Sequence, residues 1–368
     1  MKVNTFAKAL AAGLGTVAVT LAAAGAPAAA NPVGAPTFRD VVAVGSDTTY
    51  EMMNGLSNRL RLNGDAANPL ALASYDPTPV GEMIQTRSTG CTFPRPNGSG
   101  QGKAALLASE GGSGGIWSGF NVLGCVDVAR SSSGPSSLTT SGSLAYASFG
   151  VDAVSYAQTA TSDLPASMTL VQLQRVYRCL TTVIAGTPIQ PRLIQAGSGT
   201  RSYWNGKMGI TDIEIGNHDY PCLEAQPTVQ EHSGNVLNGH PDQIVPLSIA
   251  QYISQGNHAS IDATYGVTLD DRRGEAVLGK INNVSPYAAD GVSLNTTFPF
   301  NRDVYNVIPT AKLSNPLIAN LFVGATSQVC NNQALIKAFG FGFRPSTGSQ
   351  PANLAQQGCG DVYLKGNN

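Results

Sequence analysis

The sequence is poor in charge and has no basic cluster. Charged residues make up only 12% of the 368-residue chain, and the formal net charge of -1 becomes -3 once Lys2 and Lys8 are left out. No run of Lys or Arg is present that would follow a nucleic-acid backbone. We therefore expect no nucleic acid among the partners of this protein.

Long apolar runs are missing beyond the first thirty residues. Lys2 and Lys8 precede an apolar stretch over 9–24, and small residues at 28–30 match a signal-peptidase site. No later stretch reaches the ~20 apolar residues that a membrane-spanning helix needs. We expect a signal peptide over 1–30, no membrane span in the mature chain, and a secreted or periplasmic protein. The first cysteine is Cys91, so the lipid-anchor cysteine of a bacterial lipoprotein is absent.

The cysteines lack the spacing of a zinc site, because no two of them are separated by two residues. An exported chain with an even number of cysteines indicates disulfide bonds. Six cysteines allow fifteen connectivities. We expect the pairing in sequence order, Cys91 with Cys125, Cys179 with Cys222 and Cys330 with Cys359. We expect no metal and no cofactor.

Strand-like and helix-like segments alternate along the chain, which indicates an α/β protein with mostly parallel sheets. About 338 residues remain after the leader, which favours two domains over one. The expected strands lie at 41–44, 126–130, 144–158, 189–195 and 296–309. The expected helices include 50–60, a start near Ile116, 167–180, 201–210, 246–255, 316–323 and 332–339.

Four loops of small, hydroxyl-bearing residues follow these segments. One of these loops is Gly197-Ser198-Gly199-Thr200, which lies between an apolar stretch and the start of an expected helix. Glycines let backbone N–H groups turn toward one point, the hydroxyl groups add donors, and a helix N-terminus adds partial positive charge. Similar loops stand at 45–49, 111–115 and 131–134. Together they predict a crevice at the carboxyl ends of parallel strands that surrounds a small oxyanion.

The order of these motifs resembles the phosphate-binding proteins of bacterial ABC phosphate importers. It is carried by "VAVGSDTTYEM", "EGGSGGI", "VDVARSSSGP", "TLVQLQRVY" and "QAGSGTRSYW", followed by "VPLSIAQYIS" and "FPFNRDVYNVIP". The resemblance implies a type II periplasmic-binding-protein fold, with two α/β lobes joined by two crossing strands. Lobe I would be discontinuous, over 37–148 and 298–368, and lobe II would span 149–297. The crossing strands would lie near 149–156 and 298–308.

The same resemblance implies the residues that contact the ligand. By position in the motifs they would be Thr48, Thr49, Ser113, Ser132, Ser198, Gly199 and Thr200. Asp47 and Arg201 are further candidates beside these loops. Arg130 flanks another loop, and for it we expect surface or interlobe pairs.

The chain departs from the family at two charged positions. The family has an arginine four positions before the loop serine, and here that position is Ile194. An aspartate of the third loop, which accepts a proton of phosphate and rejects sulfate, is replaced by Ser132. Arg192 and Arg201 are close to the first of these positions but do not occupy it, and without the acceptor the site loses one means of telling phosphate from sulfate. Asp47 and Asp127 are the candidates to compensate, with a helix cap or a surface position as the alternative for each.

The expected function is reversible capture of inorganic phosphate by lobe closure, without catalysis. The protein would be a monomer, and its partner would be an ABC permease. One alternative is a secreted hydrolase, because Gly111-Gly112-Ser113-Gly114-Gly115 also matches the G-x-S-x-G nucleophile elbow. A phosphatase-like enzyme and an adhesion protein with a vestigial pocket remain further alternatives. We expect the four histidines, His218, His232, His240 and His258, to be solvated.

Overall fold

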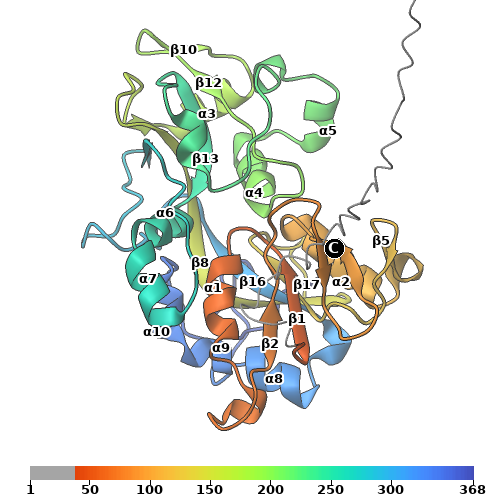
Figure 1. Ribbon diagram of the computed structural model, residues 1–368. Coiled ribbons are helices and arrows are strands. Elements are labelled where there is room, and N and C mark those ends of the chain that lie inside the picture. Colours follow the sequence, from red (N-terminus) through yellow and green to blue (C-terminus); the bar gives the residue numbers. More distant parts are fainter. Residues whose placement is uncertain (1–37) are drawn as a thin grey trace, which may run out of the picture.

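The computed structural model describes residues 38–368, which form an α/β protein of two lobes (Figure 1). The expected signal peptide lies outside the described residues. A nine-stranded sheet runs through both lobes in the order β12-β13-β8-β16-β7-β1-β2, and β14 and β17 pair with β8. These strands are β1 (Val41–Gly45), β2 (Leu72–Ser74), β7 (Val128–Ser131), β8 (Leu144–Thr159), β12 (Gln190–Pro191), β13 (Gln243–Ser248), β14 (Ala276–Leu278), β16 (Asn301–Pro309) and β17 (Lys365–Gly366).

Strand direction differs between the lobes and their junction. Strand β1 is parallel to β2 and β7 in the lower lobe of Figure 1, and β12 is parallel to β13 in the upper lobe. The long strands β8 and β16 are antiparallel to each other and to the strands beside them. The sheets are thus parallel within each lobe, and the two expected crossing strands join them.

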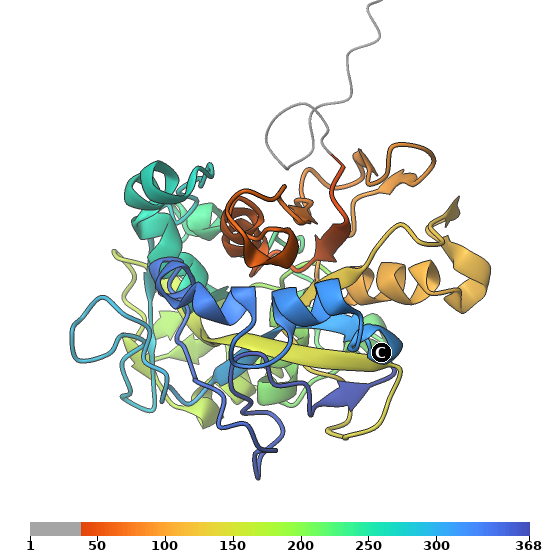
Figure 2. The same ribbon diagram turned by 90° about the horizontal axis from the view of Figure 1, so that it is seen from below.

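The helices cover both faces of the sheet. The main ones are α1 (Tyr50–Ser57), α2 (Ser99–Ser109), α3 (Leu170–Tyr177), α4 (Gly199–Met208), α5 (Asp212–Gly216), α6 (Ile249–Gly256), α7 (His258–Tyr265), α8 (Pro316–Phe322), α9 (Gln328–Asn331) and α10 (Gln333–Ala338). Seen from below, the C-terminal helices lie beside α1 (Figure 2). Phe339, directly after α10, comes close to Gly55 of α1, which shows how the chain end completes the first lobe.

Short strands and 3-10 turns lie outside the main sheet and helices. The short strands are β3 (Met83–Gln85), β4 (Thr92–Pro94), β5 (Ile116–Trp117), β6 (Phe120–Asn121), β9 (Ser167–Met168), β10 (Val183–Ile184), β11 (Thr187–Pro188) and β15 (Lys280–Ile281). The 3-10 turns are η1 (Leu62–Gly64), η2 (Gly112–Gly115), η3 (Pro221–Leu223), η4 (Gly234–Leu237) and η5 (Thr310–Lys312).

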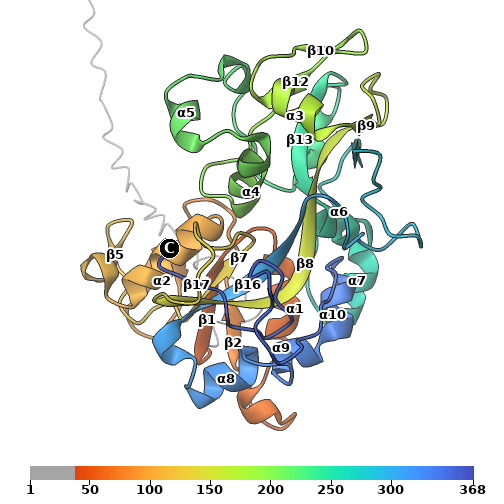
Figure 3. The ribbon, with the colours of Figure 1, turned by 180° about the vertical axis from the view of Figure 1, so that it is seen from behind.

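Strand β8 runs through both lobes and connects them. All of its sixteen residues are buried, because both of its faces are covered along the whole length. Viewed from behind, it curves from the lower lobe into the upper one (Figure 3). The expected lobe limit at 148/149 falls inside this strand, and the limit at 297/298 falls just before β16. That these segments move as separate lobes stays a prediction.

Most expected elements are present, and one is wrong. The helix expected from Ile116 is absent, because Ile116 and Trp117 form β5, which pairs with β6 in a hairpin. The strand expected over 189–195 shortens to Gln190–Pro191. The disulfide pairing in sequence order is confirmed, with Cα–Cα distances of 5.3, 5.6 and 5.7 Å. Over the described residues, no helix is both long and apolar enough to cross a membrane.

Candidate functional site

Three helices begin at one place between the lobes. Thr48 and Thr49 precede α1, Ser99 opens α2, and Ser198 caps α4 by accepting a hydrogen bond from Arg201 N at 3.1 Å. The N-terminal turn of each helix has unpaired backbone N–H groups and partial positive charge. This convergence gives the region a preference for negative charge that no single loop would supply.

The hydroxyl groups of these loops lie within reach of one another. Thr48 Oγ1 is 3.1 Å from Thr200 Oγ1, and Ser99 Oγ is 3.3 Å from Ser132 Oγ. Ser132 N also donates to Ser99 Oγ at 3.0 Å. We call Thr48, Ser99, Ser132, Ser198 and Thr200 the hydroxyl cluster. All five residues are buried, with exposed fractions of 3% or less.

The cluster lies where the lobes meet. Thr48, Ser99 and Ser132 come from the first lobe, whereas Ser198 and Thr200 come from the second. Backbone contact at the same place is close, because Gly100 N donates to Gly197 O at 3.0 Å. The structure therefore brings the segments at 97–102 and 197–200 into direct contact.

Glycine is required on the second-lobe side of this contact. A Cβ atom added to Gly199 would lie 2.5 Å from Ser132 Oγ and closer still to Ser99 Oγ. A side chain at this position would displace both serines. Gly199 thus permits the approach of α4 to the first lobe.

Arg130 shapes the first loop rather than the ligand surface. Its guanidinium is fully buried and donates to the carbonyl oxygens of Ala43 and Tyr75, at 3.1 and 2.7 Å, and to Ser74 Oγ at 2.9 Å. The surface or interlobe pairing expected for Arg130 is therefore wrong. Backbone carbonyl oxygens near the ends of β1 and β2 accept these hydrogen bonds and fix the position of the Arg130 guanidinium.

Arg302 is the cation of the cluster. It stands opposite Asp152 in the register of β16 and β8, and its Nη2 atom lies 2.8 Å from Asp152 Oδ2 and 2.8 Å from Thr200 Oγ1. The side chain of Arg302 is 4% exposed and that of Asp152 is fully buried. Strand β16 thus places the guanidinium of Arg302 against Thr200, at the start of α4.

Two carboxylates and a histidine border the hydroxyl cluster. Ser198 Oγ donates to Glu231, Gln230 Nε2 donates to Asp47, and His232 Nε2 is 3.1 Å from Thr48 Oγ1. All three ionisable groups are buried, with exposed fractions of 2% or less. The expectation that His232 is solvated is therefore wrong.

The two carboxylates differ in their titration. Burial, together with the nearby charge of Glu231, raises the pKa of Asp47 to about 6. Burial alone would also raise the pKa of Glu231, but His232 and the hydrogen bond from Ser198 outweigh it and lower this pKa. Glu231 is consequently the group that remains an ionised acceptor across the neutral range.

Several buried polar atoms of this region have no hydrogen-bond partner among residues 38–368. They are Ser46 Oγ, Asp47 Oδ1, Thr49 Oγ1, Glu231 Oε1, His232 Nδ1 and Arg302 Nη1. Buried polar groups are normally paired, so a concentration of unpaired donors and acceptors marks a place where a polar ligand fits.

Seven of the nine candidates from the sequence lie together. These are Asp47, Thr48, Thr49, Ser132, Ser198, Gly199 and Thr200. Arg201 lies beside them, but its guanidinium is engaged by Asp212 Oδ1 at 2.8 Å and by Ile194 O at 2.7 Å. It therefore anchors α4 and does not face the cluster.

Ser113 is the candidate that the structure places elsewhere. It is exposed in η2, beyond the C-terminal end of α2, whereas Ser99 at the N-terminal end of the same helix meets Ser132. The loop that matters is thus "NGSGQG" at 97–102. Its glycine-serine pattern ahead of "KAALLAS" was a signal for this position.

The nucleophile-elbow alternative for Ser113 is wrong, because this serine follows a helix rather than a strand. Thr48 and His232 are in hydrogen-bond contact, but His232 Nδ1 has no partner among the described residues that would orient the ring. The same Nε2 atom also faces Glu231 Oε1 at 3.7 Å, whereas a Ser-His-Asp triad uses the two ring nitrogens for separate partners.

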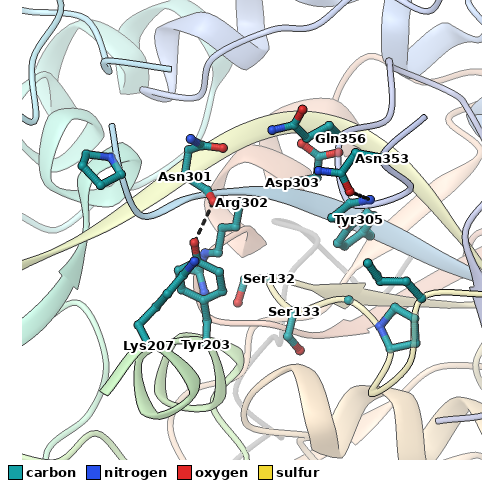
Figure 4. A pocket seen from close by; sticks show the side chains of 15 residues that line it. Ser132, Ser133, Tyr203, Lys207, Asn301, Arg302, Asp303, Tyr305, Asn353 and Gln356 are labelled. Atoms are coloured by element: carbon teal, nitrogen blue, oxygen red, sulfur yellow. Dashed lines mark hydrogen bonds between the residues drawn. The ribbon is translucent and has the colours of Figure 1, made fainter. Parts of the chain in front are cut away.

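A cavity of about 370 Å³ adjoins the cluster beside β16 (Figure 4). Ser132 and Arg302 line it as well as belonging to the buried region. Tyr203 and Lys207 of α4 lie on one side, and Asn353 and Gln356 of the C-terminal segment lie on another.

No protein-family description matches the chain, and no curated protein matches its sequence. Three similar solved structures share 14–15% identity with it. An ABC-type phosphate transport receptor from Vibrio cholerae has 14% identity and a TM-score of 0.49, over 82% of this chain and 99% of that one. The protein PstS from Borrelia burgdorferi has 15% identity and a TM-score of 0.42, over 83% and 98%.

The third is a human phosphate-binding apolipoprotein, with 15% identity and a TM-score of 0.46 over 82% of this chain and 90% of that one. The chain is similar to phosphate-binding proteins. This is also the class that the sequence motifs resemble.

Proposed function

We propose that this chain is a secreted solute-binding protein that captures inorganic phosphate between its two lobes. The observation that supports this best is the convergence of three helix N-termini on the hydroxyl cluster, beside Arg302. Backbone N–H groups, hydroxyl donors and one guanidinium provide what a small oxyanion requires. None of these groups has to form or break a covalent bond.

The carboxylates around the cluster favour phosphate over sulfate. Glu231 and Asp47 are buried beside the donors and would repel a fully ionised anion. Phosphate at neutral pH still carries a proton, which one of these carboxylates accepts, whereas sulfate has none. A buried acceptor left unpaired by sulfate costs about 1–3 kcal/mol, or more when the acceptor is charged.

Charged groups from other elements replace those missing at Ile194 and Ser132. In this proposal Arg302, on a crossing strand, supplies the cation, and Glu231 supplies the proton acceptor. Both contact residues of the loop that begins α4, because Arg302 donates to Thr200 and Ser198 donates to Glu231. The site therefore keeps both kinds of charge with a different set of residues.

Capture would operate by closure of the lobes. A ligand at the cluster contacts donors of both lobes only when they are together, so binding shifts the population toward the closed state. We further propose that an ABC permease receives the ligand from the closed form. The small-residue loops would then act as a reversible clamp.

Titration calorimetry with phosphate and with sulfate tests the proposal. Unliganded protein, prepared by partial unfolding and refolding, should release saturable heat with phosphate and little with sulfate. The double variant Ser198→Ala/Thr200→Ala should lose phosphate binding. Ser202→Ala, an exposed serine on the same helix, is the matched control and should bind as the native chain does.

Replacement of the acceptor tests selectivity separately. Glu231→Gln should narrow the preference for phosphate over sulfate by at least about tenfold, since an amide can donate to a fully ionised oxygen. Folded protein that binds neither anion would refute phosphate capture. Equal affinity for both anions in the native chain would refute the role given to Glu231.

A further inference from the structure

The cavity beside β16 is far larger than a phosphate ion requires. Its volume is about 370 Å³. A water molecule occupies about 30 Å³ in the liquid, and sites for small organic ligands begin near 300 Å³. The space therefore suits an organic group, and it begins where the hydroxyl cluster ends.

Two residues connect the cavity to the cluster. Ser132 lines the cavity and also lies 3.3 Å from Ser99 through the two Oγ atoms. Arg302 lines the cavity and donates to Thr200 through Nη2, while its Nη1 atom has no partner among residues 38–368. An unpaired guanidinium nitrogen on a side chain only 4% exposed is a donor that a polar ligand in the cavity can use.

Lys207 provides a second cation at the cavity. Its Nζ atom lies 5.2 Å from the centre of the Tyr203 ring and 5.5 Å from that of Phe300. Among the described residues no carboxylate lies within ion-pair distance of it. The ammonium group is therefore held by aromatic faces, with its hydrogen-bond donors free for an acceptor.

The acidic residue of the cavity does not cancel these charges. Asp303 accepts from Arg344 Nη1 at 2.5 Å and from Gln357 N at 2.6 Å. Its charge is thus balanced by Arg344, on the side of the C-terminal segment. Arg302 is itself paired with Asp152, so Lys207 is the unpaired cation of the cavity and Arg302 adds the free Nη1 donor. The amide side chains of Asn353 and Gln356 stand across from them (Figure 4).

We propose that the cavity holds the organic part of a phosphomonoester whose phosphoryl group occupies the hydroxyl cluster. This inference rests on the proposed function, because it uses the same phosphoryl site. The ester oxygen passes between Ser132 and Arg302, and an acceptor of the organic part, such as a carboxylate or a hydroxyl group, meets Lys207. The ligand class is then a small phosphorylated acid or polyol as well as free phosphate.

Calorimetry with 3-phosphoglycerate as the probe tests this assignment. The native chain should bind it, and inorganic phosphate should displace it, because both place a phosphoryl group in one cluster. Lys207→Met should weaken 3-phosphoglycerate binding about tenfold or more, the range for a hydrogen bond to a charged group, and change phosphate affinity less than twofold. Lys207→Arg should restore most of the loss.

Lys280→Met is the matched control, since Lys280 is exposed on β15 away from the cavity lining. Thermal melting of each variant checks that the fold is retained. Phosphate binding without any 3-phosphoglycerate binding overturns the cavity assignment and leaves the proposed function intact. The same holds if Lys207→Met weakens both ligands equally. Binding of neither ligand refutes the proposed function as well.

Discussion

Arg302 and Asp152 face each other across the two crossing strands, and the same guanidinium also donates to Thr200 at the start of α4. The junction of the lobes and the candidate ligand site are thereby linked through one buried side chain. Removing one partner of a buried ion pair typically costs about 3–5 kcal/mol. Any test of Arg302 must therefore keep its charge.

Arg302→Lys keeps the charge but loses the forked contact. A lysine offers a single ammonium group, which cannot reach Asp152, Thr200 and a ligand together. We expect phosphate affinity to fall at least about tenfold, as for a lost hydrogen bond to a charged group. The control is Arg344→Lys, on the neighbouring ion pair with Asp303, which should leave affinity unchanged when both are measured by calorimetry.

Gly199 should tolerate no side chain if the closed state is the binding state. Gly199→Ala places a methyl group 2.5 Å from Ser132 Oγ, so both serines of the first lobe must turn away and α4 must withdraw. We expect phosphate affinity to fall at least about tenfold, the equivalent of about 1.4 kcal/mol. Thermal stability of the unliganded protein should change little.

Gly206→Ala supplies the comparison, because this glycine of the same helix has no atom within 4 Å of an added Cβ. Replacing a helical glycine by alanine is expected to stabilise by about 0.4–1 kcal/mol. An unchanged affinity in Gly199→Ala would mean that ligand binding does not require the contact of Gly199 with Ser99 and Ser132.

Local sequence was enough to predict much of this fold. The loop at 197–200 joins an apolar segment to a helix, and its serine cap, glycine and threonine are all neighbours in the chain. The loop at 45–49 follows the same pattern. Such short-range signals located α1, α4 and the strands β8 and β16, because turn chemistry and burial periodicity act within a few residues. That β8 and β16 cross between the lobes was implied only by the family resemblance.

The rest of the site depends on contacts between distant residues. Arg302 and Asp152 are 150 positions apart and meet only through the register of two long strands. Asp152 interrupts the apolar segment "FGVDAV", and Arg302 lies in "FNRDVY", which is buried from 302 onward; a charge in a buried strand needs a partner. Glu231 and His232 come from a loop between short elements, where no periodicity indicates which side chains point inward.

Ser99 and Ser113 lie in similar glycine-rich segments, but at opposite ends of α2. Each stands in a glycine-rich segment, one at the N-terminal end of α2 and the other beyond its C-terminal end. The pattern is similar, but only the N-terminal end carries free N–H groups and faces the second lobe. The direction of the helix decides between them, and a local motif does not contain it.

A pair of alanine variants tests this distinction. Ser99→Ala removes a hydroxyl group that contacts Ser132 Oγ at 3.3 Å and should weaken phosphate binding by about 0.5–1.5 kcal/mol, the range for one hydrogen bond. Ser113→Ala changes an exposed side chain and should bind as the native protein does. A loss with Ser113→Ala but not with Ser99→Ala would reverse the assignment of the second loop.

Glu51 should give the folded protein a distinctive dependence on pH. This carboxyl of α1 is 1% exposed, with Tyr50 Oη donating to it at 2.8 Å and Arg272 Nη2 only 3.5 Å away. Burial is the main cause that raises its pKa from 4.5 to about 7, against the opposing charge of Arg272. The folded state therefore binds this proton more tightly than the unfolded chain.

The sign of the effect follows from linkage. The stabilisation from protonated Glu51 is fully present below pH 4.5 and is lost as the pH rises through about 7. Over that window the loss amounts to about 3 kcal/mol, since one pKa unit corresponds to about 1.4 kcal/mol. Asp47 acts in the same direction up to its raised pKa of about 6, so the native chain should lose stability between pH 4 and 8 from both groups.

Glu51→Gln isolates the first contribution. The amide keeps the shape and the acceptor for Tyr50 but cannot ionise, so the variant should gain stability relative to the native chain as the pH rises. Urea unfolding at pH 4, 6 and 8, with disulfides intact, gives the free energy of unfolding for both proteins. The difference should shift in favour of the variant by about 3 kcal/mol across this range. Parallel curves would show that Glu51 ionises in the folded state as easily as in the unfolded one.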